Sequence, residues 1–382
     1  MSLNSFWSVA TPLAYRLRGD RSFAYLGEML SRRDWSAARL QELQLAKLKA
    51  LLQHCQREVP YYQDLFRTTG FDPEAVSRLE DLRVLPVLTK NTVRANGDRL
   101  IAGSMRGRLR IHHTGGSTGI PLTFYRHQEY EELAFAGMLR DFHQCGWRVG
   151  EPIAQFWGVS GARQLGPRAR LVRGLKETAS RFFRFNAFDV SPENTRLWHR
   201  RLQALGPAAW FGYASTIYLV CQHLAELRLG LPGAVRGVFT TAEPLYDFQR
   251  ELIEKTLACK VYNVYGSTEV LDVSCECRCG RMHVRTDAAV VEYGEAAPGG
   301  GRELILTSLN NYAMPYLRYA NEDLAEPVDG ACECGDCSPL MSFPMGRTFG
   351  NFTAPSGQII HGQFFVKLLY DVAGIERFRT DF

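Results

Sequence analysis

Residues 114–121 read TGGSTGIP, and this short segment carries more information about the chain than any other. Its three glycines lack side chains, so the backbone can approach a polyphosphate closely, and the hydroxyls of Thr114, Ser117 and Thr118 add hydrogen-bond donors. No Gly-Lys-Ser/Thr sequence follows, so the segment is not a Walker loop. Apolar residues alternate before and after it, which predicts a strand, a phosphate-binding loop and a second strand.

The composition indicates a folded protein with a large core. The chain has 382 residues, of which 46% are apolar and 22% charged, with a net charge of +5. No run approaches the roughly 18 apolar residues of a transmembrane helix, and the N-terminus lacks a signal-peptide pattern. We therefore expect a cytoplasmic protein. The weak positive charge does not favour nucleic acid, and no membrane partner is expected.

The hydrophobic pattern predicts an α/β protein. Leucines at three- and four-residue spacings predict helices in residues 1–80, and strands alternate with helices over residues 190–270. Alternation of this kind is typical of a mostly parallel sheet. Further strands are expected over residues 284–320, where segments with strand character are separated by Gly/Pro-rich turns.

Three more segments define a family resemblance. They are Asn263-Val264-Tyr265-Gly266-Ser267-Thr268-Glu269, then Met314-Pro315-Tyr316-Leu317-Arg318-Tyr319 followed by Asp323, and Gly346-Arg347. Together with residues 114–121, they resemble the adenylate-forming superfamily of acyl-CoA synthetases, peptide-synthetase adenylation domains and luciferases. The resemblance points in particular to the branch of phenylacetate–CoA ligase-like and capsule-biosynthesis proteins, and it covers about residues 35–375.

The resemblance implies roles for individual residues. Thr114, Ser117, Thr118 and Gly119 would bind phosphates, and Thr240-Thr241-Ala242-Glu243-Pro244 would pack against adenine, with Ala242, Glu243 and Pro244 at the nucleotide. Asn263, Gly266 and Ser267 would shape the pocket in which Tyr265 stacks on adenine, Thr268 contacts the α-phosphate and Glu269 binds magnesium. Asp323 would bind the ribose, although Glu322 beside it leaves an alternative, and Arg347 would contact ribose and phosphate.

The acid pocket is harder to define from sequence. By the same resemblance, Trp157, Tyr213 and Ser215 would line the carboxylate site, and their aromatic character indicates an aryl or arylalkyl acid. The alternative is that these aromatics belong to the core. A second open question is the basic stretch Arg163–Arg184, which is either a solvated helix face or a docking surface for the phosphates of a thiol cofactor or an acidic carrier protein.

Six of the ten cysteines fall in two short clusters. Cys275, Cys277 and Cys279 precede His283, and Cys332, Cys334 and Cys337 follow some fifty residues later. Thiolates and imidazole at short spacings are ligands of tetrahedral zinc. The family register selects Cys277, His283, Cys332 and Cys334 as one closed, structural site. Reduced free thiols, or less favourably an iron–sulfur cluster, are the alternatives.

The resemblance implies an N-terminal helical segment (1–80), an adenylate-forming core (81–346) and a hinge with the start of a C-terminal lid (347–382). The expected fold is two α/β subdomains with parallel-rich sheets and a small β-barrel-like subdomain holding the zinc. The family's catalytic lid lysine has no counterpart, because Lys367 does not match it.

The implied activity is ATP- and magnesium-dependent formation of acyl-AMP from a small carboxylic acid. Transfer to coenzyme A or a carrier thiol would follow. The alternatives are transfer to an amine and a module that only binds the nucleotide or acyl-AMP. The sequence leaves open whether the chain forms a homodimer.

Overall fold

The computed structural model describes residues 3–113, 122–158, 166–297, 300–344, 351–353 and 359–361. Four helices open the chain, as the leucine spacing predicts. Ser36 caps the third helix, since its hydroxyl accepts a hydrogen bond from the Arg39 amide, and Gly70 ends the fourth in the left-handed conformation. Pro60 separates the third helix from the fourth and begins the latter, where its missing N–H costs nothing. The bounds are α1 (Leu3–Arg16), α2 (Ser22–Ser31), α3 (Ala37–Glu58) and α4 (Pro60–Thr69).

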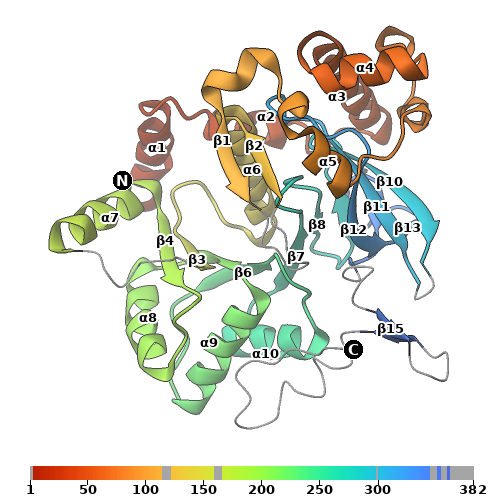
Figure 1. Cartoon of the computed structure of the whole chain (residues 1–382). Helices are drawn as coiled ribbons and strands as arrows, with labels where there is room; N and C mark the ends of the chain where they lie inside the picture. Colours follow the sequence, from red (N-terminus) through yellow and green to blue (C-terminus); the bar gives the residue numbers. More distant parts are fainter. Residues whose placement is uncertain are drawn as a thin grey trace.

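A nine-stranded sheet forms the centre of the molecule (Figure 1). Its strand order is β13-β14-β9-β8-β7-β6-β5-β3-β4, with parallel pairing from β4 to β7 and antiparallel pairing from β7 to β13. The strands are β3 (Ile153–Trp157), β4 (Phe182–Asn186), β5 (Ala208–Gly212), β6 (Val235–Thr240), β7 (Val261–Tyr265), β8 (Ser274–Glu276), β9 (Met282–Val284), β13 (Pro327–Val328) and β14 (Leu340–Met341).

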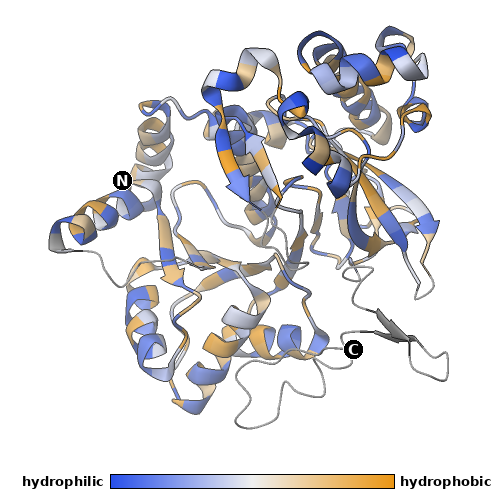
Figure 2. Ribbon diagram, in the orientation of Figure 1, coloured by the Kyte–Doolittle hydropathy of each residue, from blue (hydrophilic) through white to orange (hydrophobic). Residues whose placement is uncertain are grey.

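Helices cover both faces of the parallel half. Side chains alternate along a strand, so Phe156 packs with one apolar cluster, under α8 to α10, and Ile153 with another, against α2 and α6. Figure 2 shows apolar residues concentrated along the strands and at the inner helix faces. The covering helices are α6 (Gln128–Phe142), α8 (Pro192–Leu205), α9 (Ala214–Glu226) and α10 (Asp247–Leu257).

A second, three-stranded antiparallel sheet lies beside the central one and packs on α3 and α4. Its strands are β10 (Ala289–Ala296), β11 (Arg302–Ser308) and β12 (Tyr319–Ala325). The Tyr62 hydroxyl joins α4 to this region, because it donates to the carbonyl oxygen of Pro315 and accepts from the Leu317 amide, both at 3.0 Å. Leu88 pairs with Tyr319 in a single bridge, which brings residues 85–90 beside β12.

The remaining elements are short or peripheral. They are η1 (Pro73–Ala75), η2 (Leu79–Val84), α5 (Lys90–Asn96), η3 (Gly97–Leu100), η4 (Gly103–Arg108), η5 (His143–Cys145), α7 (Pro167–Ser180), and the hairpins of β1 (Arg110–His113) with β2 (Thr123–Arg126) and β15 (Asn351–Thr353) with β16 (Ile359–His361). In the part of the chain that the structure describes, no helix has the length and apolarity needed to cross a bilayer.

A close backbone contact holds α1 against the central domain. Gly150 has a φ of +94°, and a Cβ at this position would lie 2.5 Å from the Ser8 nitrogen. Arg181 donates to the Gly150 carbonyl oxygen at 3.0 Å and lies over the Trp7 ring, 5.2 Å from its centroid. Only glycine fits at this contact, which fixes where α1 lies.

The predicted α/β class is confirmed, with two corrections. The parallel strands gather in one sheet and not in two, because the strands over residues 284–325 pair antiparallel through short turns. The cysteine clusters lie on the antiparallel half of the central sheet and not in a separate barrel, because β8 pairs with β7 and β9 pairs with β8.

Candidate functional site

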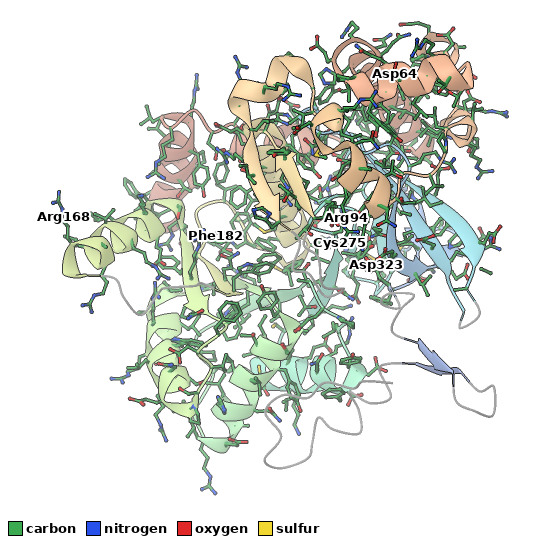
Figure 3. The ribbon with its side chains drawn as sticks, viewed as in Figure 1. Asp64, Arg94, Arg168, Phe182, Cys275 and Asp323 are labelled. Atoms are coloured by element: carbon green, nitrogen blue, oxygen red, sulfur yellow. The ribbon has the colours of Figure 1, made fainter. Side chains whose placement is uncertain are left out.

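A hydrogen-bonded group of side chains joins the end of β7 to β12. The Tyr265 hydroxyl donates to Asp323 Oδ2 at 2.8 Å, and Asn321 Nδ2 donates to the Tyr265 oxygen at 2.6 Å and to Asp323 Oδ2 at 3.0 Å. Burial, together with the neighbouring Asp323, raises the pKa of Tyr265 well above its usual value, so the phenol keeps its proton. Figure 3 labels Asp323 close to the centre of the molecule.

The irregular part of β12 shapes this group. The register with β11 shifts between Glu303 and Ile305, and Glu322 has a φ of 70°, in the strained left-handed region. Asn321 and Asp323 both contact Tyr265, whereas Glu322 forms an ion pair with Lys90. Of the two acidic candidates for the ribose, the structure places Asp323 beside Tyr265.

The adjoining turn holds a buried carboxylate. Glu269, which is 6% exposed, accepts from the Tyr319 hydroxyl at 2.9 Å and from the Thr268 hydroxyl at 3.0 Å. The turn is closed by Ser267, whose amide donates to the Val270 carbonyl oxygen and whose hydroxyl accepts from the Val270 amide, both at 2.9 Å. The carboxylate is thus held in a fixed position between β7 and β12.

Arg126 is a site residue that the sequence analysis missed. It lies at the end of β2, and its guanidinium donates to the carbonyl oxygen of Thr268. Burial lowers its pKa, while the nearby Glu269 acts in the opposite direction. No local motif marks an arginine five residues after a glycine-rich loop, so only the three-dimensional fold reveals this contact.

The residues at Glu269 fit a magnesium ion. Each carboxylate oxygen accepts one hydrogen bond from a hydroxyl and has further lone pairs for a metal. Magnesium prefers one or two carboxylates together with substrate phosphates and water, which matches a single buried glutamate next to a phosphate-binding hydroxyl.

The predicted acid pocket lies at the carboxyl ends of β3 and β5. The Trp157 and Tyr213 rings stack, with centroids 4.4 Å apart and planes 26° apart. The Ser215 amide, at the start of α9, donates to the carboxylate of Glu243, and Ala242 has a φ of 68°. The structure therefore brings Trp157, Tyr213 and Ser215 next to the 240–244 segment, at the sheet edge where parallel α/β folds bind ligands.

The remaining predicted nucleotide residues have mixed outcomes. Asn263 is buried in β7, and its backbone amide donates to the carboxylate of Glu276 at 2.8 Å. A side chain at Gly266 would crowd the Asp272 amide at 3.1 Å. Pro244 is exposed in the turn before α10. The proposed phosphate loop, including Thr114, Ser117, Thr118 and Gly119, lies outside the described residues, as do Arg347 and Lys367.

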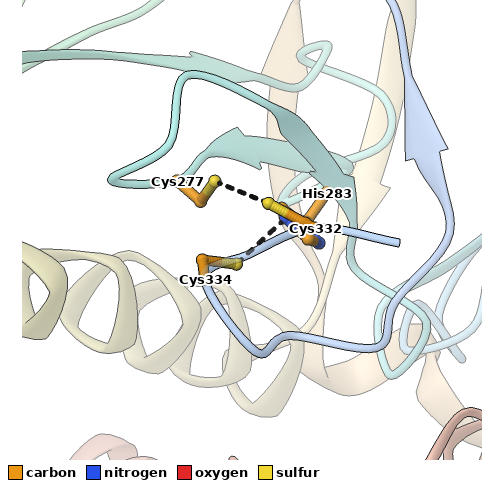
Figure 4. A group of neighbouring side chains, drawn as sticks. All are labelled: Cys277, His283, Cys332 and Cys334. Carbon is orange, nitrogen blue, oxygen red and sulfur yellow. Dashed lines mark hydrogen bonds between the residues drawn. The ribbon is translucent and has the colours of Figure 1, made fainter. Parts of the chain in front are cut away.

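The four predicted zinc ligands come together (Figure 4). Cys277 follows β8, His283 lies in β9, and Cys332 and Cys334 lie between β13 and β14. Their ligand atoms all lie within 4.8 Å of one another, with Cys277 Sγ 3.6 Å from Cys332 Sγ and Cys334 Sγ 3.3 Å from His283 Nε2. A tetrahedron with zinc–sulfur bonds of about 2.3 Å places its sulfurs about 3.8 Å apart, so the spacing suits zinc.

The surroundings of the four residues also suit a metal. Backbone amides of Cys279 and Asp336 donate to the sulfurs of Cys277 and Cys334, at 3.3 and 3.4 Å. Asp336 Oδ2 lies 3.7 Å from His283 Nδ1, where a carboxylate can orient a metal-bound imidazole. Cys337 is exposed and Cys275 is buried within the sheet, so neither joins the four, and Cys279, which is exposed, contacts Cys332 from outside the group.

Comparison with known proteins agrees with this geometry. No family model matches the chain. Protein CapK of Staphylococcus aureus is 24% identical over 297 residues, which are 75% of this chain and 62% of CapK. A phenylacetate–coenzyme A ligase of Thermus thermophilus is 27% identical over 336 residues, covering 81% of this chain and 71% of the ligase. The corresponding ligase of Escherichia coli is 27% identical over 322 residues, covering 77% and 69%.

Among the solved structures that resemble this chain is a 2-hydroxyisobutyryl-CoA ligase in the postadenylation state. It aligns with a TM-score of 0.71 at 20% identity, over 90% of this chain and 75% of the ligase. The chain has the fold of the adenylate-forming superfamily. Its homologues are the phenylacetate–CoA ligases and CapK, and it spans 62% to 71% of the length of those curated relatives.

Proposed function

We propose that this chain activates a carboxylic acid with ATP, forming acyl-AMP and pyrophosphate. The observation that supports this most directly is the meeting of the Thr268–Glu269 turn with Asp323 and Tyr265 between β7 and β12. Segments some fifty residues apart thereby supply a metal-binding carboxylate, a hydroxyl donor and a ribose-binding carboxylate to one place. The homologous phenylacetate–CoA ligases support the same reaction type.

The proposed roles follow from the chemistry of nucleotides. Asp323 accepts hydrogen bonds from ribose hydroxyls, and Tyr265 places its ring against adenine next to the 242–244 segment. The Thr268 hydroxyl, which donates to Glu269 in the structure, would rotate about its Cβ–Oγ bond to donate to the α-phosphate. The loop residues Thr114, Ser117 and Thr118, with Gly119 allowing close approach, bind the leaving phosphates, and Arg347 contacts ribose and phosphate.

Attack of a carboxylate on the α-phosphate brings two anions together. Magnesium held by Glu269 would supply the charge neutralisation that this step needs. The protein's own contribution is orientation: Tyr319 fixes Glu269, and Arg126 holds the Thr268 carbonyl oxygen, so the turn faces the nucleotide without rearranging. The acid carboxylate would enter from the Trp157–Tyr213 side, near Ser215.

We also propose the kind of carboxylic acid that is activated and the acceptor of the acyl group. The stacked aromatic pair of Trp157 and Tyr213 favours an aromatic acid, because flat rings stack on it with little loss of conformational freedom. Coenzyme A is the proposed acceptor, by homology to CoA ligases, with a carrier thiol as the alternative.

We further propose that Cys277, His283, Cys332 and Cys334 bind a structural zinc ion. Four protein ligands close a tetrahedral site, which leaves no position for a substrate. The domain bounds 1–80, 81–346 and 347–382, and a cytoplasmic location, are retained as proposals from the sequence.

Acid-dependent exchange of labelled pyrophosphate into ATP tests the activity. A panel of aryl, arylalkyl and short aliphatic acids should give exchange with at least one acid, and Asp323→Ala should abolish it, whereas the exposed variant Glu251→Gln should not. ATP binding without exchange for any acid would show that the chain is only a nucleotide-binding module. A hydroxylamine trap for acyl-AMP checks the product independently.

A further inference from the structure

Half of the exposed large apolar side chains lie in one small region. Of the fourteen such side chains among the described residues, seven lie on α1, on the residue that follows it and on α7, with exposed fractions between 43% and 79%. These two helices contain only 28 residues. The seven residues, which we call the α1–α7 face, are Phe6, Val9, Leu13, Leu17, Leu171, Val172 and Leu175.

The spacing shows that these side chains form stripes. Positions 6, 9, 13 and 17 recur every three or four residues, and position 175 follows 171 by four residues and 172 by three, so each set lies along one side of its helix. Other side chains of the two helices pack inward. On α1, the Trp7 ring lies under the guanidinium of Arg181, and on α7, Glu177 is only 8% exposed. The two helices also pack on each other, at the same margin of the molecule (Figure 1). An apolar stripe directed to solvent is the reverse of the usual arrangement of a surface helix.

The charges around the stripes are of one sign. Helix α1 contains no acidic residue, and the single acid of α7, Glu177, is paired with Arg173 and Arg201. Arg168, Arg170 and Lys176 are exposed and form no ion pair within the described ranges. Figure 3 shows Arg168 at the outer end of α7, away from the core.

A cavity between the two helices has the same chemistry. Its volume is about 1140 Å³, and it lies between the end of α1, helix α7 and the edge strand β4. Its apolar lining includes Phe135, Met138 and Phe182, while Arg18 and Arg184 add positive charge. An apolar interior beside unpaired cations suits a molecule with an apolar chain and an anionic head group.

We propose that the α1–α7 face docks on an anionic lipid bilayer. The leucine and phenylalanine side chains would enter the boundary between head groups and acyl chains, while Arg168, Arg170 and Lys176 pair with lipid phosphates. Basic amphipathic helices with an apolar face bind membranes in this way. The proposal is independent of the reaction and replaces the sequence-based expectation that no membrane partner exists.

Two other occupants fit the surface less well. An acidic carrier protein would satisfy the arginines, but it gives no reason for seven apolar side chains to be exposed. A second copy of the chain in a two-fold dimer would cover the apolar stripes, but it would supply no acid to the exposed cations, because α1 has none and Glu177 is already paired. An anionic bilayer satisfies the apolar and the charged parts together.

Flotation of the full chain with vesicles tests the proposal. The protein should float with vesicles of phosphatidylcholine and phosphatidylglycerol and not with phosphatidylcholine alone, and added salt should weaken binding. Leu171→Ser/Leu175→Ser and Arg168→Glu/Arg170→Glu should each lower the partition coefficient about tenfold or more. Leu219→Ser/Leu231→Ser, exposed leucines elsewhere on the surface, is the matched control and should bind like the unaltered chain.

Four results would overturn the proposal. The first is a failure to float, and the second is unchanged binding by the Leu171→Ser/Leu175→Ser variant. The third is loss of a dimer by that variant in light scattering without lipid, which would assign the face to a second copy. The fourth is a lower melting temperature of that variant without lipid, which would show that another part of the chain already covers the leucines. Pyrophosphate exchange, measured on all variants, should stay unchanged and confirms that they are folded.

Discussion

The two halves of the central sheet carry two clusters of opposite design. At the end of the parallel half, Tyr265 and Glu269 bond to β12 side chains and retain capacity for further ligands. On the antiparallel half, Cys277 and His283 meet Cys332 and Cys334 so closely that one ion would use all four. An incomplete ligand set suits chemistry, and a complete set suits stability.

The largest expected effect concerns the closed cluster. Cys334→Ser should remove bound zinc and lower the free energy of unfolding of the antiparallel half by more than about 4 kcal/mol, because metal binding contributes directly to folding. Elemental analysis and thermal unfolding measure the two quantities. Cys337→Ser, an exposed cysteine outside the cluster, should change neither. Freshly purified protein without zinc would refute the metal assignment.

The next effect concerns the open cluster. Glu269→Gln keeps the size of the side chain and its contact with Tyr319 but removes the charge proposed to bind magnesium. Pyrophosphate exchange should fall about 100-fold, equivalent to about 2.7 kcal/mol, with an unchanged melting temperature. Glu251→Gln, on the surface of α10, should retain full exchange. Normal exchange in Glu269→Gln would mean that the metal binds elsewhere.

A smaller effect is expected for the bond between β7 and β12. Tyr265→Phe removes the hydroxyl that links Asn321 and Asp323 but keeps the ring. The KM for ATP should rise about tenfold, equivalent to about 1.4 kcal/mol, the value of one buried hydrogen bond to a carboxylate. Steady-state kinetics against ATP measures this. Tyr61→Phe, at a half-buried position on α4, is the control. An equal KM for ATP in both variants would contradict the proposal that Asp323 binds the ribose.

The smallest expected effect concerns the buried charged residues at the turn between β7 and β8, where the parallel half of the central sheet meets the antiparallel half. Burial raises the pKa of Asp272 to about 7, although Arg140 opposes the shift. The folded state therefore keeps a proton that the unfolded chain releases near pH 4, so stability falls as pH rises from about 4 to about 7. Asp272→Asn should flatten this slope in urea unfolding, whereas the exposed Asp34→Asn should not. An unchanged slope would show that Asp272 is ionised when folded.

Much of the fold could be predicted from the sequence because its periodicities are local. The alternation of strands and helices predicted over residues 190–270 appears in the structure as α8, β5, α9, β6, α10 and β7. The partition into sheets could not be predicted, because pairing between β7 and β8 depends on the Asp272 turn, whose φ of 55° no short motif indicates.

The candidate site shows the same division. Tyr265, Glu269 and Asp323 were found because their spacing within short segments matches a family pattern. Arg126 and Asn321 were missed, since each acts on a residue more than fifty positions away and lies in no motif. The choice between Glu322 and Asp323 needed the partner of each, Lys90 and Tyr265, and these contacts depend on the irregular pairing of β12 with β11.

Gly150 gives the N-terminal helix its closest backbone contact with the central domain, beside its packing on α7. Any larger residue there would push against the backbone at Ser8 and force the first helix from its position, while the central sheet below keeps its pairing. One substitution could thus displace the α1 part of the proposed lipid-facing region from the enzyme body. The reaction and the location of the protein in a cell could then be separated without shortening the chain.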